Sequence, residues 1–256
     1  MNPTTPAPIV LITGASRGLG KSAALHAAAQ GIDVILTYRS RAEEAQSVVQ
    51  EIQALGRRAV ALPLDTGLSA SFVAFADTVR EVLAREWQRE RFDFLVNNAG
   101  VGSYASLMDT TEAQFDDLMN IHFKGVFFLS QKLLPLMNDG GRIVNISTGL
   151  TRFALPNYAA YASMKGAVEV LTRYMAKELG PRGMAVNVVA PGAIATDFGG
   201  GQVRDNAQLH AFVASGTALG RVGLPDDIGG VVASLLTPAN RWVNAQRIEA
   251  SGGQFL

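Results

Sequence analysis

The sequence predicts an α/β fold of the doubly wound type, a seven-stranded parallel sheet flanked by helices on both faces. The apolar run 9–12 leads directly into a loop with three glycines and then into an alanine-rich helix. Further along the chain, short apolar runs alternate with longer segments of helical spacing. A length of 256 residues suits one large core, so we expect a single domain over 1–256.

The strands are predicted from short apolar runs, which are typical of strands buried on both faces of a parallel sheet. They cover 9–12, 32–37, 59–64, 92–96, 141–147, 185–189 and 246–250. The helices are predicted from helical spacing, glycine stops and nearby prolines. They cover 19–30, 41–55, 72–87, 111–118, 158–179 and 226–236, and the segment 121–137 is strongly apolar.

Two segments fall outside this alternation. Residues 1–8, MNPTTPAP, are expected to form an N-terminal tail, and they have neither the basic segment nor the apolar stretch of a signal peptide. Residues 194–218 have weak periodicity and contain three consecutive glycines. We interpret this second segment as a mobile flap on the substrate side of a site.

Composition narrows the class of partner. The chain has 22 basic and 22 acidic residues without a long run of one sign, so we expect no nucleic-acid or membrane surface. The absence of cysteine excludes disulfides and thiolate metal sites, and no metal site is predicted. A small-molecule partner and a cytoplasmic location are the expectations.

The glycine loop predicts a phosphate-binding turn. Gly14 allows a tight turn, Gly18 allows close approach of the backbone to a phosphate, and Gly20 allows the helix to pack closely on the sheet. The helix N-terminus then offers free N–H groups and a partial positive charge to a pyrophosphate. A glycine-rich turn with no ligand is the alternative for the loop taken alone.

The end of the second strand predicts which dinucleotide is bound. An acidic residue there would select NAD through the ribose 2′-hydroxyl, but the chain has Tyr38, Arg39 and Ser40 and no carboxylate before Glu43. Arg39 and Arg17 could both reach a 2′-phosphate, so NADP(H) is favoured over NAD(H). Each arginine taken alone could equally lie in solvent.

Two polar positions follow later strands. Asp65 could accept a hydrogen bond from an adenine amino group or cap the next helix, and spacing alone favours the cap. The amides of Asn97 and Asn98 could tie neighbouring loops together.

Tyr161 and Lys165 are the candidates for chemistry. Their i, i+4 spacing places them on one helix face, so the ammonium is expected to lower the phenol pKa and make Tyr161 a proton donor or acceptor. The hydroxyls of Ser147 and Thr148 could polarise a substrate carbonyl. A Tyr/Lys pair at this spacing also occurs by chance on structural helices.

Together these motifs resemble the short-chain dehydrogenase/reductase family over 9–253, and in particular its ketoreductases and 3-oxoacyl-carrier-protein reductases. The segment 13–20 is similar to the family's cofactor loop, Asp65 to its adenine contact, 97–100 to its NNAG turn and 161–165 to its YxxxK pair. The resemblance implies a Rossmann-type fold that binds NADP(H). The predicted cofactor-binding residues are Gly14, Ser16, Arg17, Gly18, Leu19, Gly20, Tyr38, Arg39, Ser40, Asp65, Thr66, Asn98, Ala99, Gly100, Tyr161, Lys165, Pro191, Gly192, Ile194 and Thr196.

Two positions depart from the family pattern. Thr148 stands thirteen residues before Tyr161, where the family has serine, and Ser147 is its neighbour, so either hydroxyl could act. His122 falls where the family has an asparagine that relays protons to the lysine through water. His122 could join that relay or serve only in packing.

The implied reaction is hydride transfer between NADP(H) and a carbonyl or secondary alcohol, with reduction of a ketone or 3-oxoacyl-type substrate as the expected direction. A sugar or polyol dehydrogenase working oxidatively, and a non-catalytic dinucleotide sensor, are the alternatives. Tyr104, Phe153, Tyr158 and Phe198 would form a partly aromatic pocket if they converge. The resemblance also implies a homo-oligomer, a tetramer or a dimer.

Overall fold

The computed structural model describes residues 6–256, so residues 1–5 of the predicted tail lie outside the described part of the chain. Seven parallel strands form one sheet in the order β3-β2-β1-β4-β5-β6-β7, as predicted. The order reverses between β1 and β4, and ligands of such sheets bind outside the carboxyl ends of the strands at that point. The strands are β1 (Ile9–Ile12), β2 (Asp33–Tyr38), β3 (Ala59–Pro63), β4 (Phe92–Asn97), β5 (Met137–Ile146), β6 (Ala185–Pro191) and β7 (Arg247–Ala250).

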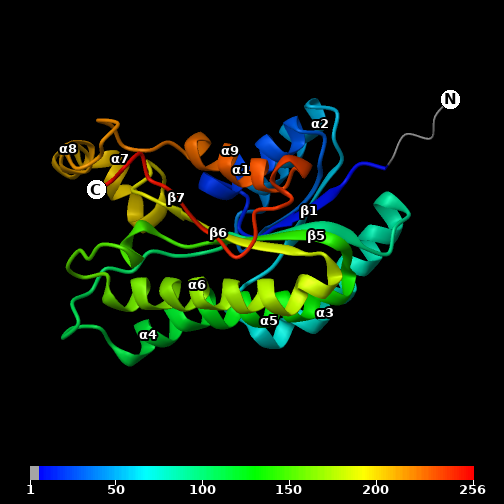
Figure 1. Ribbon diagram of the computed structural model, residues 1–256, viewed down its shortest axis with the longest axis horizontal. Helices are drawn as coiled ribbons and strands as arrows, with labels where there is room; N and C mark the ends of the chain where they lie inside the picture. Colours follow the sequence, from blue (N-terminus) through cyan, green and yellow to red (C-terminus); the bar gives the residue numbers. More distant parts are fainter. Residues whose placement is uncertain (1–5) are drawn as a thin grey trace.

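Helices cover both faces of the sheet (Figure 1). The upper layer in that view contains α1 (Gly18–Ala29), α2 (Ala42–Ala54) and α9 (Pro225–Leu235), and the lower layer contains α3 (Phe72–Val82), α4 (Glu112–Met119), α5 (Gly125–Leu133) and α6 (Ala159–Leu179). Alternate residues of each strand enter the two cores, as the pleat requires. In β1, Val10 and Ile12 pack under α1, while Ile9 and Leu11 pack toward α3 and α5.

The apolar segment 121–137 is not one helix. It begins in a π-helical turn, η3 (Asn120–Lys124), which joins α4 to α5, and it passes through the 3₁₀ turn η4 (Leu134–Leu136) into β5. The strand predicted at 141–147 therefore starts earlier, at Met137, which pairs with Phe92 before the register shifts and Arg142 pairs with Phe94. The irregular stretch of β5 between these two pairs contains Gly140 at φ +75°, a conformation that favours glycine.

The segment 194–218 is more regular than predicted. It contains the 3₁₀ turn η7 (Phe198–Gly201) and the helices α7 (Gln202–Asp205) and α8 (Ala207–Ser215), which lie with the C-terminus at one end of the molecule (Figure 1). Asn206 caps α8 by accepting the N–H groups of Gln208 and Leu209, and the mobility of this segment on the substrate side stays a prediction. Within residues 6–256 no helix combines the length and apolarity needed to cross a bilayer.

Candidate active site

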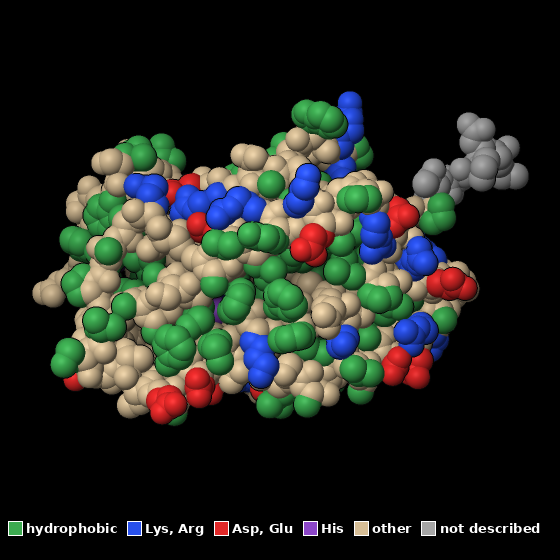
Figure 2. Space-filling view, turned by 60° about the horizontal axis from the view of Figure 1, so that its bottom comes forward, with side chains coloured by type: hydrophobic (Ala, Val, Ile, Leu, Met, Phe, Trp, Pro, Cys, Tyr) green, Lys and Arg blue, Asp and Glu red, His purple; other side chains and the backbone are tan. Residues whose placement is uncertain are grey.

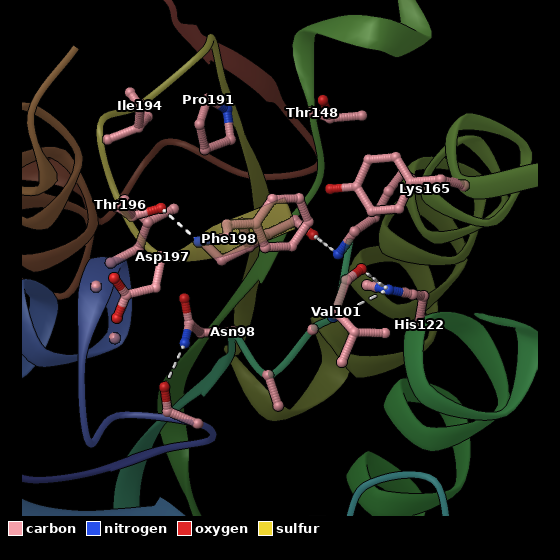
Figure 3. A pocket seen from close by; sticks show the side chains of 18 of the residues that line it. Asn98, Val101, His122, Thr148, Lys165, Pro191, Ile194, Thr196, Asp197 and Phe198 are labelled. Atoms are coloured by element: carbon pink, nitrogen blue, oxygen red, sulfur yellow. Dashed lines mark hydrogen bonds between the residues drawn. The ribbon is translucent and has the colours of Figure 1, made fainter. Parts of the chain in front are cut away.

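A cleft of about 390 Å³ lies at the carboxyl ends of the strands. Its walls come from the loops after β1, β2, β4, β5 and β6 and from the N-terminal half of α6. All residues that the sequence predicted for the cofactor and for catalysis line this cleft, although they are spread from Gly14 to Thr196. Figure 3 shows His122 and Lys165 on one side, Thr196 and Asp197 on the other, and Phe198 between them.

The glycine loop has the shape that a phosphate-binding turn requires. Gly14 has φ +64°, and a Cβ there would lie 2.9 Å from the Cα of Ala99. A Cβ at Gly20 would lie 2.5 Å from Nδ2 of Asn98, so α1 packs against the loop only because no side chain intervenes. The loop thus forms a cradle that side chains would fill, and it leads directly into the N-terminus of α1.

The NNAG turn holds this loop in place. The side chain of Asn98 donates to the carbonyls of Thr13 and Gly14 at 2.8 and 3.0 Å, and the Thr13 hydroxyl accepts the N–H groups of Asn98 and Ala99. Asn97 donates to Asn145 and Ser130 inside the sheet. These amides therefore tie neighbouring loops together, and the Asn98 amide is already engaged with the protein backbone.

The adenosine end of the cleft is rich in arginine. Arg39 is exposed there beside Ser40 and Arg41, and Arg17 lies across the loop. Arg17 is exposed, and its guanidinium pairs with Asp197 at 2.8 Å. Asp197 also pairs with Arg204 of α7, so the glycine loop is fastened to the segment that follows β6.

Asp65 does not cap a helix, contrary to the preference from spacing. Its Oδ1 accepts the N–H of Gly67 at 2.8 Å in a local turn, and the following 3₁₀ turn η1 (Ser69–Ser71) has Leu68 at its N-cap. The carboxylate lies on the wall of the cleft, where an adenine group could reach it.

Tyr161 and Lys165 share one buried face of α6. The Lys165 ammonium lies 5.9 Å from the centre of the Tyr161 ring and donates to the carbonyl of Ile146 at 2.8 Å. Burial lowers the pKa of Lys165 to about 8. Burial also raises the pKa of Tyr161, and a hydrogen bond with the Thr148 hydroxyl offsets only part of that effect. The expected lowering of the Tyr161 pKa by lysine is therefore not found, and the phenol stays protonated at neutral pH.

The two adjacent hydroxyls have different surroundings. The Ser147 hydroxyl donates to Oε1 of Glu169 at 2.7 Å, away from the cleft chemistry. The Thr148 oxygen accepts the N–H of Leu150 at 3.3 Å, which leaves its own hydrogen free to donate, and this hydroxyl interacts with Tyr161. Of the two alternatives left open by the sequence, the geometry favours Thr148 as the hydroxyl next to the reacting group.

His122 is fully buried beside Tyr161. The π turn η3 places its ring edge-on to the Tyr161 ring, with 5.1 Å between the ring centres. Its Nε2 lies 2.8 Å from the Val101 carbonyl, while its buried Nδ1 has no hydrogen-bond partner. Burial, and secondarily the Lys165 charge, lowers the pKa of His122 to about 3. A neutral imidazole fixed in this way favours the packing role over a relay through an imidazolium.

This burial predicts an acid-sensitive contribution to stability. As pH falls below 6.5, His122 gains a proton in the unfolded chain but not in the folded one until about pH 3, so stability should fall by up to about 1.4 kcal/mol per pH unit in that window. His122→Asn should flatten this dependence, as measured by urea unfolding between about pH 7 and pH 4. The control is His210→Asn on exposed α8. Parallel pH profiles for wild type and His122→Asn would contradict the assignment.

Three of the four predicted aromatic residues line the cleft, and helix α8 adds further apolar residues. Phe153, Tyr158 and Phe198 line the cleft, and the Phe198 ring lies 5.8 Å from that of Tyr161. Tyr104 is 69% exposed and packs at a steep angle against the Tyr158 ring, but it does not line the cleft. Leu209, Phe212 and Val213 of α8 complete the wall instead. Their i, i+3, i+4 spacing was the signal in the sequence for this amphipathic helix.

A glycine-rich loop at the switch point of a parallel sheet, with a buried Tyr–Lys pair beside it, defines a dinucleotide-dependent oxidoreductase. A family model described as enoyl-(acyl carrier protein) reductase matches residues 14–254. The chain belongs to the short-chain dehydrogenase/reductase family, which confirms the resemblance of its motifs.

Relatives along the whole chain are named as reductases. A hydroxynaphthalene reductase-like protein of Metarhizium brunneum is 35% identical, over 96% of this chain and 94% of its own length. The promiscuous reductase LugOII, whose structure has been solved and which catalyses keto-reduction at C1 during lugdunomycin biosynthesis, is 36% identical with a TM-score of 0.93 over 98% of this chain and 99% of its own. The angucycline C-6 ketoreductase LanV, solved with bound NADP, is 33% identical with a TM-score of 0.92 over 97% and 95%. LanV has also been solved with NADP and rabelomycin.

Proposed function

We propose that the protein is an NADPH-dependent ketoreductase. The observation that carries this proposal is the convergence of the Tyr161 and Thr148 hydroxyls, both able to donate a hydrogen bond, at the inner end of a cleft whose outer end carries Arg17 and Arg39. The glycine cradle and the N-terminus of α1 fit a pyrophosphate between these two ends. The bound NADP of the crystallised relative LanV supports the same choice of cofactor.

A bound NADPH would supply the hydride for the carbonyl carbon from C4 of its nicotinamide. Thr148 donates a hydrogen bond to the carbonyl oxygen, and Tyr161 transfers its phenolic proton to that oxygen as the alcohol forms. Burial raises the pKa of Tyr161, so the phenol carries its proton at neutral pH and can donate it. Lys165 would hold the nicotinamide ribose, and Pro191, Gly192, Ile194 and Thr196, which line the cleft, would hold the nicotinamide side.

The wall of the cleft favours a bulky apolar ketone, and we propose one built on fused rings. Phe153, Tyr158, Phe198 and Phe212 present flat apolar surfaces on the substrate side. Hydroxynaphthalene and angucycline, after which two of the relatives are named, are fused-ring compounds. A sugar would need more hydrogen-bonding groups than this wall offers, so the polyol dehydrogenase is the less favoured alternative, and a sensor would not need a proton donor at this position.

The test is consumption of NADPH, followed at the absorbance of the reduced nicotinamide. We would offer a tetralone, a naphthol-type tautomeric ketone, a 3-oxoacyl thioester, an enoyl thioester and an aldose. Turnover of the fused-ring ketones supports the proposal. Turnover of the enoyl thioester alone would replace it with double-bond reduction, and NADPH binding without turnover on any compound would favour the sensor.

Cofactor preference should depend on Arg39, which is exposed at the adenosine end without an acidic partner among the described residues. Arg39→Asp would place a carboxylate where NADP(H) carries its 2′-phosphate. We expect kcat/KM for NADPH to fall by about 10²-fold, since the change removes an attraction and adds a repulsion, each of the order of 1–2 kcal/mol. The value for NADH should fall far less or rise. Arg41→Asp, on a guanidinium already paired with Glu44, is the comparison.

The proposal also covers the oligomeric state of the protein and its location in the cell. We propose a homo-oligomer, a tetramer or a dimer, that associates through the outer faces of α4, α5 and α6. These faces expose Phe115, Phe127, Phe128, Val170 and Tyr174, and Figure 2 shows hydrophobic side chains gathered on this side of the molecule. Light scattering on the purified protein tests the stoichiometry. The cytoplasmic location, like the single-domain organisation over 1–256, is proposed from the sequence.

A further inference from the structure

Four charged side chains form a chain of ion pairs behind the loop that carries Thr148. They are Arg152 after the 3₁₀ turn η5 (Gly149–Thr151), Glu169 on α6, and Arg247 and Glu249 on the edge strand β7. We call them the C-terminal charge cluster. None of the four lines the cleft, and none was singled out from the sequence.

Arg247 is the member of this cluster that reaches the Thr148 loop. Its Nε pairs with Oε1 of Glu169 at 2.9 Å, and its Nη1 pairs with Oε2 of Glu249 at 2.9 Å. Its Nη2 donates to the backbone carbonyl of Thr148 at 3.3 Å and to the hydroxyl of Thr151 at 3.1 Å. All three guanidinium nitrogens are thus engaged in one rigid planar fork, which a flexible ammonium could not reproduce.

Glu169 holds the same loop from the helix side. Its Oε1 accepts the hydroxyls of Ser147 and Thr151, each at 2.7 Å, in addition to Nε of Arg247. The residue before Thr148 and the end of the turn after it are therefore fixed through one carboxylate oxygen. The Glu169 and Arg247 side chains are only 13% and 25% exposed, so solvent screens this pair less than a surface pair.

We propose that Arg247 is a positioning residue for the reduction. By holding the Thr148 carbonyl and the Thr151 hydroxyl, Arg247 fixes the short extended stretch between β5 and η5 and so sets the direction of the Thr148 hydroxyl toward the substrate oxygen. The inference rests on the proposed ketoreductase function. It explains why the edge strand, which lies 99 residues further along the chain, carries an arginine at this position.

Arg152 provides the internal comparison. It pairs with Glu249 through two nitrogens, at 2.8 and 2.7 Å, but its remaining bonds go to the carbonyls of Gln254 and Phe255 in the C-terminal tail. No bond connects its side chain to Thr148 or Thr151 in the described structure. A general loss of charge from the cluster can therefore be separated from the loss of the bonds to the loop.

The experiment compares Arg247→Met and Arg152→Met in the full-length protein, with NADPH and a ketone that the wild type reduces. For Arg247→Met we expect kcat to fall by about tenfold to a hundredfold, because misplacement of a catalytic group by about 1 Å can cost 10²-fold. The KM for NADPH should stay within about threefold, and the isotope effect from 4-deuterated NADPH should rise as hydride transfer becomes more rate-limiting. Arg152→Met should keep kcat within about threefold of wild type.

Arg247→Lys separates a loss of positioning from a folding defect. Its ammonium can still neutralise Glu169 but cannot at the same time reach the Thr148 carbonyl. We expect its kcat to lie between wild type and Arg247→Met at an unchanged melting temperature. Equal kcat in wild type and either Arg247 variant would overturn the positioning role, and so would an equal loss in Arg152→Met. A wild type that turns over no ketone would overturn the proposed function and this inference together, whereas a failure confined to the variants concerns Arg247 alone.

Discussion

Tyr161→Phe should reduce ketone turnover by about 10²- to 10⁴-fold, the range that general acid catalysis contributes. The change removes one oxygen from a buried ring that stays packed against His122 and Phe198, so the fold and the cleft should persist. Binding of NADPH, measured by fluorescence titration, should change by less than about threefold, since most cofactor contacts come from other loops. The loss should therefore appear in kcat.

Tyr174→Phe is the matched control, because it removes a hydroxyl from an exposed position on the same helix. It should leave both turnover and binding unchanged. A Tyr161→Phe variant with a near-normal rate would contradict the assignment of Tyr161 as the proton donor and, with it, the proposed mechanism.

Thr148→Ala should lower kcat by about 10²-fold or more, whereas Ser147→Ala should lower it only a few-fold. The Thr148 hydrogen is free to donate to a developing oxyanion, and removal of one such donor typically costs 10²- to 10³-fold. Thr148→Ser keeps the hydroxyl and should recover most of the activity. Steady-state kinetics of the three variants with one ketone make the comparison.

The loss in Ser147→Ala should appear in stability, because Ser147 donates to the carboxylate of Glu169. A hydrogen bond to a charged group contributes about 1.5–3 kcal/mol, although Thr151 and Arg247 still satisfy that carboxylate in the variant. Urea unfolding measures this loss. If Ser147→Ala is the inactive variant and Thr148→Ala the active one, the two roles are reversed.

The elements of the fold that were predicted correctly are those with a local cause. The strands at 9–12 and 92–96 are apolar runs long enough to cross a sheet, and the long helix before Pro181 has helical spacing throughout. The boundary that differs from the prediction depends on a long-range contact. β5 starts at Met137 and not at 141, because Met137 pairs with Phe92 on β4.

In the candidate site, too, the correct predictions come from residue spacing, and the others depend on contacts between residues distant in the sequence. Residues recognised from spacing, such as the glycine loop and the Tyr161–Lys165 pair, do line one cleft. Spacing could not choose between Ser147 and Thr148, because that choice depends on a carboxylate at position 169 that reaches one hydroxyl and not the other. Spacing also gave the wrong direction for the Tyr161 pKa, because the burial that raises it depends on tertiary packing.

The class of fold, the family, the cofactor cradle and the absence of an acidic ribose selector could be predicted from the amino-acid sequence, because each depends on residues that lie close together along the chain. The tertiary structure was needed to show which hydroxyl is bonded to Glu169, which aromatic rings line the cleft and that Arg247 donates to the Thr148 carbonyl from the far edge of the sheet. The physical reason is that hydrogen bonds and burial act over a few ångströms in space. The separation of two residues along the chain therefore does not show whether they will form such a contact in the folded protein.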